Sequence, residues 1–151
     1  MYVLALDLSL VNTGLCIFEE NGTPVKVFSV STNSKHELKE RLKTIADCFV
    51  QVKKQYEIGT VVLERGFTAH NLATQQLFRV HGIANLIFYK SEQIYYPPST
   101  IKKIITGSGK ADKAEVRKVI SEKWPELKIE NFDQSDAVAI GYSYFIDKKI
   151  L

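Results

Sequence analysis

The sequence predicts an α/β fold with a mixed five-stranded sheet: three antiparallel N-terminal strands, then parallel strands, flanked by helices. Three observations lead to this prediction. The chain opens with an apolar run, residues 2–8, that contains a single carboxylate, Asp7. Turn residues, among them Asn21 and Gly22, then separate strand-like segments, which is typical of antiparallel pairing. Beyond residue 34, segments with helical periodicity alternate with short apolar segments, which is typical of parallel strands joined by helices.

Composition favours one globular, soluble domain, residues 1–151. Hydrophobic residues make up 45% of the chain and charged residues 25%. We expect neither a secreted nor a membrane-spanning protein, because no stretch approaches the roughly 18 apolar residues of a membrane span and the N-terminus lacks a basic signal region. Cys16 and Cys48 lie in apolar patterns without paired spacing. Reduced thiols and a cytoplasmic location, in a bacterial cell or a phage-infected host, are therefore expected.

The first three strands are predicted from the turns between them. After the apolar run, residues 9–13 form a polar turn and residues 14–18 return as a second strand. The pair Asn21-Gly22 is the strongest short hairpin signal available, so residues 24–31 are expected to form a third, antiparallel strand. Three adjacent strands then surround Asp7.

A long helix follows the third strand. Ser34 and Glu37 have the spacing of a capping box, and apolar residues then repeat at four-three spacing, which predicts a helix over residues 36–56. Residues 60–63 are a short buried strand that ends at Glu64. Ligands bind at the carboxyl edge of such sheets, so Glu64 is placed to meet Asp7, although an ordinary strand-end glutamate is the simpler alternative.

The second helix is predicted over residues 72–90, after an exposed loop at residues 65–70. Its apolar residues occupy more than one side. A helix of this kind is either deeply buried or also faces a partner, and the sequence leaves both possibilities open.

The C-terminal part is predicted to contain one strand and three helices. Pro97 ends the strand because proline cannot donate to a sheet, and Ser99 and Asp112 are the expected caps of the first two helices. The expected elements are a strand at residues 93–96, a helix from Ser99 to Ile105, a helix from Asp112 to about Trp124, and a helix that begins at Asn131 or Asp133 and passes Ile146.

Positive charge is concentrated in one segment. The chain has a net charge of +3, and residues 99–123 alone carry seven basic against three acidic side chains, a local excess of +4. Such a segment is either a patch for phosphate groups or a solvated helix face. Its basic residues are Lys102, Lys103, Lys110, Lys113, Arg117, Lys118 and Lys123.

Four acids on distant segments form the candidate site. Asp7 and Glu64 end strands, and Asp133 and Asp136 lie three residues apart on one face of the last helix, where they could also simply complement the helix dipole. If the four converge, their oxygen ligands suit Mg²⁺ or Mn²⁺ rather than Zn²⁺. Two such ions roughly 3.5–4 Å apart would support hydrolysis of a phosphodiester.

These residues carry a family resemblance. Asp7 in an N-terminal hairpin strand, LERGF at 63–67, YPPSTIKKIITGSGKADK at 96–113 and DQSDAVAI at 133–140 together resemble the RuvC family of Holliday junction resolvases. The resemblance covers nearly the whole chain. It implies an RNase H-like fold, a homodimer, and paired symmetric nicks in four-way and related branched DNA, with two Mg²⁺ ions per site that Mn²⁺ can replace.

The resemblance also implies roles for individual residues. The four acids match the metal ligands. Lys102 and Lys113 match basic residues that contact the scissile phosphate. Phe67 matches an aromatic residue that inserts near the crossover, where an unstacked base could stack on its ring for about 1–3 kcal/mol; the alternative is a loop residue folded onto the core. The further DNA contacts expected are Arg65, His70, Lys103, Lys110 and Arg117.

The chain departs from the family pattern at two places. It continues Asp7-Leu8-Ser9 where bacterial members usually have Asp-Pro-Gly, and the loop after Phe67 is one residue shorter. Together with the small size, these changes resemble divergent bacteriophage versions. They bear on cut-site preference and on strict selectivity for four-way junctions, and they leave the acids unchanged.

Two other functions fit part of the pattern. Asp7, a polar turn and Gly14 also resemble the phosphate strand of actin-like ATPases and sugar kinases, but such proteins need a second lobe and a further glycine-rich loop. A non-catalytic branched-DNA-binding protein could keep the fold alone. Retention of all four acids argues against it, because an acid cluster without metal is destabilising.

Overall fold

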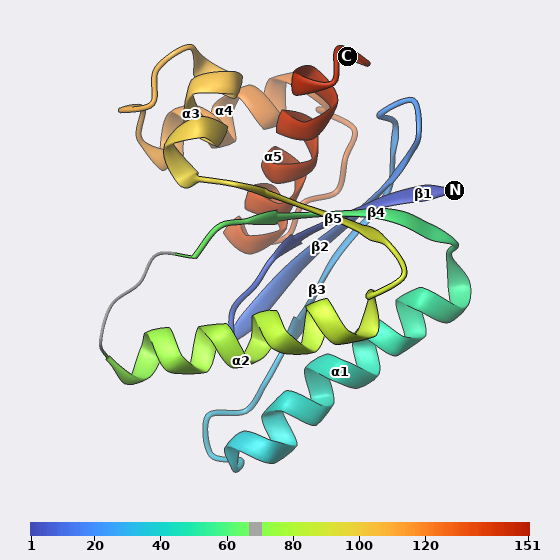
Figure 1. Ribbon diagram of the computed structural model, residues 1–151. Coiled ribbons are helices and arrows are strands. Elements are labelled where there is room, and N and C mark those ends of the chain that lie inside the picture. Colours follow the sequence, from blue (N-terminus) through green and yellow to red (C-terminus); the bar gives the residue numbers. More distant parts are fainter. Residues whose placement is uncertain (67–70) are drawn as a thin grey trace.

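The computed structural model describes residues 1–66 and 71–151, and in these residues it contains five strands and five helices (Figure 1). The strands are β1 (Tyr2–Asp7), β2 (Asn12–Glu19), β3 (Pro24–Ser31), β4 (Ile58–Glu64) and β5 (Glu92–Tyr96). The helices are α1 (Leu38–Gln55), α2 (Leu72–Ile87), α3 (Pro98–Thr106), α4 (Lys113–Lys123) and α5 (Phe132–Asp147).

The sheet has the predicted mixture of directions. Its strand order is β3-β2-β1-β4-β5. β1 pairs antiparallel with β2, and β2 with β3, while β4 runs parallel to β1 and β5 parallel to β4. The hairpin predicted at Asn21-Gly22 is present, and Gly22 has a φ of 90°, a conformation that favours glycine.

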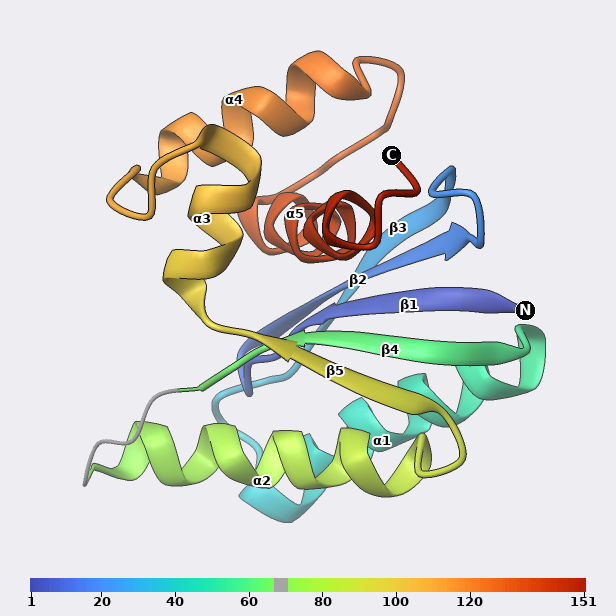
Figure 2. The ribbon, with the colours of Figure 1, turned by 45° about the horizontal axis from the view of Figure 1, so that its top comes forward.

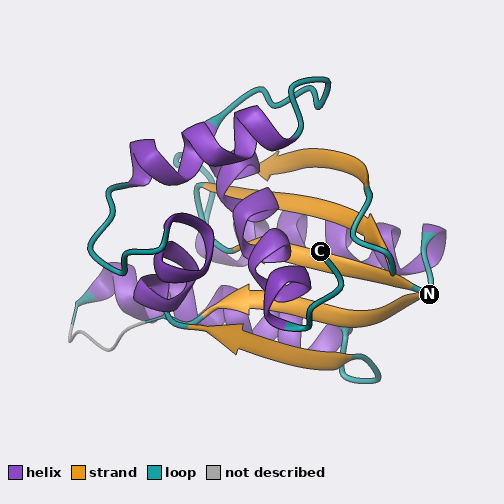
Figure 3. Cartoon of the chain, turned by 90° about the horizontal axis from the view of Figure 1, so that it is seen from above, coloured by secondary structure: helices purple, strands orange, loops and turns teal. Residues whose placement is uncertain are grey.

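Helices cover both faces of the sheet. α1 and α2 lie on one face and α3, α4 and α5 on the other (Figures 1 and 2), and Figure 3 shows the second group from above, with the strands behind it. Each face has its own apolar core. Phe49 and Phe88 are fully buried on the α1 and α2 side, and Phe18 and Phe145 on the α5 side.

Two glycines allow α5 to lie close to the sheet. A Cβ atom on Gly14 would be 2.0 Å from the backbone oxygen of Asp133, and one on Gly141 would be 2.2 Å from the ring of Phe18. A larger residue at either position would push the helix away. The first turn of α5 is therefore held directly against β2.

Two predicted helix caps are wrong. α1 begins at Leu38 without a side-chain cap, because Asn33 accepts a hydrogen bond from the Lys35 amide (2.9 Å) and forms a turn before the helix. α3 begins at Pro98 rather than after Ser99, since proline suits the first helical position, where its missing N–H has no role.

Two strand and helix ends also differ from the prediction. β2 starts at Asn12, two residues before the predicted Gly14, because Asn12 still pairs with Ser31 of β3. α2 ends at Ile87 rather than Lys90.

The structure decides between the two possibilities left open for α2. Val80 and Ala84 are buried against the sheet, whereas Leu72, Phe78 and Leu86 are 65%, 42% and 73% exposed. The helix therefore has one buried side and one exposed apolar side. Among the described residues, no helix has the length and apolar character needed to cross a membrane.

Candidate active site

Asp7 and Glu64 lie side by side at the carboxyl edge of the sheet, where the neighbouring interior strands β1 and β4 end. They are the last residues of β1 and β4, which run parallel with Leu6 opposite Leu63. Parallel strands that end together place their final side chains at the same edge. The predicted meeting of these two acids is thus a direct result of strand direction.

The first turn of α5 brings Asp133 and Asp136 to this edge. Asn131 caps the helix by accepting a hydrogen bond from the Gln134 amide (2.9 Å), and Gly14 of β2 lets the turn approach. In addition, the Asn12 side chain donates a hydrogen bond to the Asp133 carboxylate (2.8 Å). Asn12 was not predicted as a site residue, because its only signal in the sequence was its place in a polar turn.

The acids act on one another electrostatically. Burial, together with the nearby carboxylates of Asp136, Glu64 and Asp133, raises the pKa of Asp7 to about 8, while Lys113 opposes this rise. Burial also raises the pKa of Glu64, against the lowering effect of Lys113. Charges on these acids are therefore unfavourable unless a cation is near.

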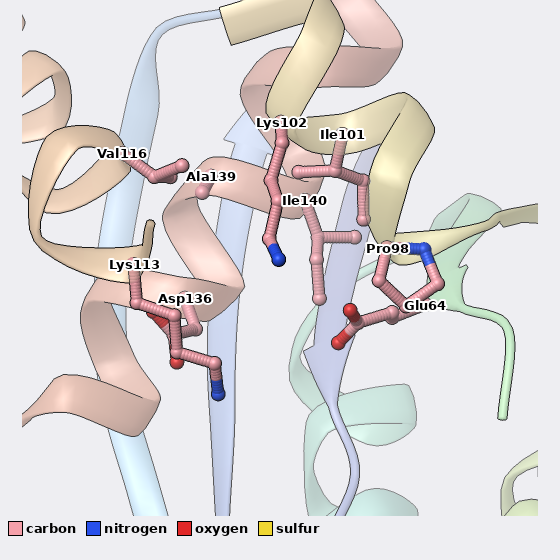
Figure 4. Close-up of a pocket in the computed structure, with 9 residues that line it drawn as sticks. All are labelled: Glu64, Pro98, Ile101, Lys102, Lys113, Val116, Asp136, Ala139 and Ile140. Atoms are coloured by element: carbon pink, nitrogen blue, oxygen red, sulfur yellow. The ribbon is translucent and has the colours of Figure 1, made fainter. Parts of the chain in front are cut away.

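Two adjoining hollows are lined by three of the four acids, and Asp133 lines neither. A cavity of about 40 Å³ is lined by Glu64, Asp136, Lys102 and Lys113, and Figure 4 shows both lysine side chains reaching into the space between the two acids. A wider hollow of about 310 Å³ is lined by Asp7 together with Glu64 and both lysines. Glu64 and the two lysines thus lie on the boundary between the hollows.

The four acids are not gathered into a finished ligand set. Within residues 1–66 and 71–151, no three Asp, Glu, His or Cys side chains are grouped closely enough to hold an ion. The site nevertheless fits a divalent cation chemically, because its donors are carboxylate oxygens and the burial of Asp7 disfavours an uncompensated charge. Side-chain movement is needed to bring all four acids onto one ion.

Asp136 has a protein cation as its partner. The Arg117 guanidinium of α4 donates to both of its carboxylate oxygens, at 3.3 Å from Nε and 3.2 Å from Nη2. The same guanidinium lies 3.9 Å from the centroid of the Phe132 ring. The sequence predicted Arg117 as a DNA contact and did not single out Phe132.

A family model described as Crossover junction endodeoxyribonuclease RuvC matches residues 3–144. The chain belongs to the RuvC family. The RuvC protein of Rickettsia typhi is 31% identical over 156 residues, which cover 99% of each chain. The Thermus thermophilus RuvC structure matches with a TM-score of 0.84 and 21% identity, over 99% of this chain and 96% of that one. The structure of the same protein in complex with Holliday junction substrate matches with a TM-score of 0.84, 18% identity and the same coverage.

These matches confirm three predictions, the first of which is the resemblance to the RuvC family itself. The RNase H-like fold is confirmed by the structural matches, and the enzyme class by the family, whose members are crossover junction endodeoxyribonucleases and metal-dependent nucleases. The small size is not a departure, because the chain covers 99% of a bacterial relative. The bacteriophage-type character stays a prediction.

The remaining predicted DNA contacts of this RuvC-family chain occupy different positions. Arg65 lines the wider hollow beside Asp7, while Lys103 and Lys110 are exposed on and after α3. Phe67 and His70 lie outside the described residues. These contacts therefore stay predictions.

Proposed function

We propose that this chain resolves Holliday junctions and related branched DNA by hydrolysing phosphodiester bonds in paired, symmetric nicks. The observation that carries the proposal is the carboxylate edge of a RuvC-family fold, where Asp7 has its pKa raised to about 8 among three further acids. A Thermus thermophilus relative of the same fold has been captured with a Holliday junction substrate. We also propose that residues 1–151 act as one nuclease domain, since all five described strands belong to one sheet. The proposed location of this domain is the cytoplasm.

The four acids would hold the metal. Asp7, Glu64, Asp133 and Asp136 supply oxygen ligands suited to two Mg²⁺ ions, which Mn²⁺ could replace. When bound, such ions supply an activated water and stabilise the leaving oxygen. Asn12 orients Asp133 through its 2.8 Å hydrogen bond, an arrangement typical of residues that support metal ligands.

Lys102 and Lys113 would bind the phosphate to be cut. They line both hollows together with Glu64, and neither forms an ion pair with an acid in the described part of the chain. Their ammonium groups are therefore available to phosphate oxygens. Arg65, Lys103 and Lys110 would contact the flanking backbone, Arg117 would do so once it leaves Asp136, and Phe67 and His70 would act at the crossover.

A homodimer would supply two sites for paired nicks. The exposed side of α2 carries Leu72, Phe78 and Leu86, and Phe78, Gly82 and Leu86 are spaced four residues apart on one helical face. An apolar stripe with a central glycine suits close contact with the same helix of a second copy. Two copies would present two carboxylate edges to the opposed strands of a junction.

The decisive experiment compares substrates and cofactors. Purified protein is incubated with labelled four-way junction, flap or linear duplex, in Mg²⁺ or in EDTA, beside the Asp7→Asn variant. We expect paired nicks in the junction, with Mg²⁺ only, and none from Asp7→Asn. Cleavage in EDTA or by Asp7→Asn would contradict the proposed chemistry.

The same experiment separates the alternatives. Junction binding without cleavage by the wild-type protein in Mg²⁺ and in Mn²⁺ would favour a non-catalytic binding protein. Turnover of ATP without DNA cleavage would favour an actin-like ATPase. Cleavage of linear duplex at the same rate as the junction would support the proposed nuclease activity but contradict its proposed selectivity for branched DNA.

A further inference from the structure

The contact between α4 and α5 places a protein cation on a carboxylate of the candidate active site. The Arg117 guanidinium donates hydrogen bonds to both carboxylate oxygens of Asp136, and the two side chains are only 23% and 20% exposed. Lys102 and Lys113 line the same cavity as Asp136 without such a pairing. The Arg117 contact is therefore a specific feature of this site and not a general result of its positive charge.

Phe132 holds Arg117 in place. Phe132 and Asp136 are four residues apart on α5, so they lie on the same helical face and the guanidinium can stack on the ring while it bonds to the carboxylate. The ring itself is 67% exposed and its centroid is 3.9 Å from the guanidinium carbon. A cation over an aromatic face is attracted by the electrons of the ring. Arg117 is thus fixed by two neighbours at once.

We propose that Arg117 is the resting counter-ion of Asp136, and that a divalent ion reaches Asp136 only by displacing it. This inference rests on the proposed function, which makes Asp136 a metal ligand. Arg117 affects metal binding only through Asp136, as a positioning residue, and is not itself a metal ligand.

Three observations indicate that the divalent ion replaces Arg117 at Asp136 and that the two cations do not bind this carboxylate together. Both oxygens of Asp136 are already engaged by the guanidinium. Their distances of 3.2–3.3 Å are longer than the roughly 2.7–2.9 Å of a tight charge-assisted hydrogen bond, so the contact is exchangeable. Asp136 is also not grouped with two further acids among the described residues, which means that it must turn toward them to share an ion.

Exchange has a consequence for metal affinity. If the ion binds only when Arg117 has left, the apparent affinity is the intrinsic affinity multiplied by the fraction of molecules in which Arg117 is disengaged. Removal of Arg117 should therefore tighten metal binding. Damage to the fold, or loss of a residue that orients Asp136 for the metal, would weaken it. The direction of the change separates these explanations.

The test measures Mn²⁺ binding to DNA-free protein by calorimetry at fixed ionic strength. We expect Arg117→Gln to bind Mn²⁺ about two- to five-fold more tightly, the range of an ion pair worth up to about 1 kcal/mol. Phe132→Ala should shift the affinity in the same direction by a smaller factor. Lys118→Gln is the matched control: it removes one positive charge from the next position of α4, where the side chain is 76% exposed and lies 4.0 Å from Glu122. Its affinity should be unchanged.

A second measurement follows the wild-type protein directly. The side-chain Nε–H signal of Arg117 in an NMR spectrum should move toward that of a free arginine as Mg²⁺ is added. Unchanged or weaker Mn²⁺ binding in Arg117→Gln, an equal gain in Lys118→Gln, or an Arg117 signal that ignores Mg²⁺ would each overturn the inference.

The outcomes also separate this inference from the proposed function. A wild-type protein that cuts junctions in Mg²⁺ while Arg117→Gln binds metal like the wild type overturns the inference alone. A wild-type protein that binds no Mn²⁺ and cuts no junction overturns both. Should Arg117→Gln fail to fold, the Phe132→Ala affinity and the NMR titration still decide the question.

Discussion

Asp7 is a carboxylate whose surroundings penalise its charge. Its pKa is raised to about 8, whereas an aspartate in an unfolded chain has a pKa near 3.9. Between these two values the folded protein keeps a proton that the unfolded chain has lost. The contribution of Asp7 to metal-free stability is therefore most favourable below about pH 4 and becomes less favourable as the pH rises toward 8.

Asp7→Asn removes this penalty. We expect the variant to raise the unfolding midpoint of metal-free protein at pH 8 by about 3 °C or more, which is roughly 1 kcal/mol for a chain of this length, and to abolish cleavage. The difference should shrink as the pH falls below 4, where Asp7 becomes protonated in both states. Thermal melts in EDTA at several pH values measure it. A lower midpoint at pH 8 would show that the acids do not repel one another.

Lys113 and Lys110 lie close in sequence but are predicted to act differently. Lys113 lines both hollows beside Glu64, so Lys113→Ala should lower the rate of nicking at saturating junction by about 100- to 1000-fold, as for other transition-state donors. Lys110 is exposed on the turn before α4, and Lys110→Ala should weaken junction binding, most strongly at low salt. Single-turnover rates and binding isotherms separate the two effects. Wild-type nicking by Lys113→Ala would remove that residue from the mechanism.

At the scale of elements, the contact between β2 and α5 positions half of the acids. Gly14→Ala would place a methyl group 2.0 Å from the Asp133 backbone oxygen, and backbone cannot yield cheaply. We expect a loss of stability of about 1–3 kcal/mol or more, with reduced cleavage. Chemical denaturation measures the loss.

The matched control for this prediction is Gly59→Ala on β4. Its added methyl group would meet the Sδ atom of Met1 at 2.9 Å, and a terminal methionine side chain can move aside. The control should therefore unfold close to the wild type. Equal losses in both variants would contradict the special role given to Gly14.

At the scale of the whole molecule, the exposed side of α2 decides the assembly. Leu86, 73% exposed, should be buried between two copies, so Leu86→Asp should convert a dimer to a monomer and uncouple the paired nicks. Light scattering gives the mass, and a cruciform plasmid reports coupled cutting. Val25→Asp, at a 44% exposed position on the opposite edge of the sheet, is the control. A monomeric wild type, or a dimer that survives Leu86→Asp, would place the assembly elsewhere.

Much of this architecture could be predicted from local patterns. The boundaries of β3 are those expected, Asp112 caps α4 as predicted, and Asn131, one of two predicted starts of the last helix, caps α5. Strand turns and helix caps depend on residues a few positions apart. The caps assigned to Ser34 and Ser99 failed for the same local reason, since Asn33 and Pro98 compete for those positions.

The sequence by itself determined the mixed sheet and the edge at which Asp7 and Glu64 meet, because strand direction follows from the lengths and types of the connections. Only the tertiary structure decided that Arg117 pairs with Asp136, that Asn12 donates a hydrogen bond to Asp133, and which side of α2 stays exposed. These contacts join residues far apart in the chain. They depend on how closely α5 approaches β2 and on where α4 crosses α5, and no local periodicity encodes either.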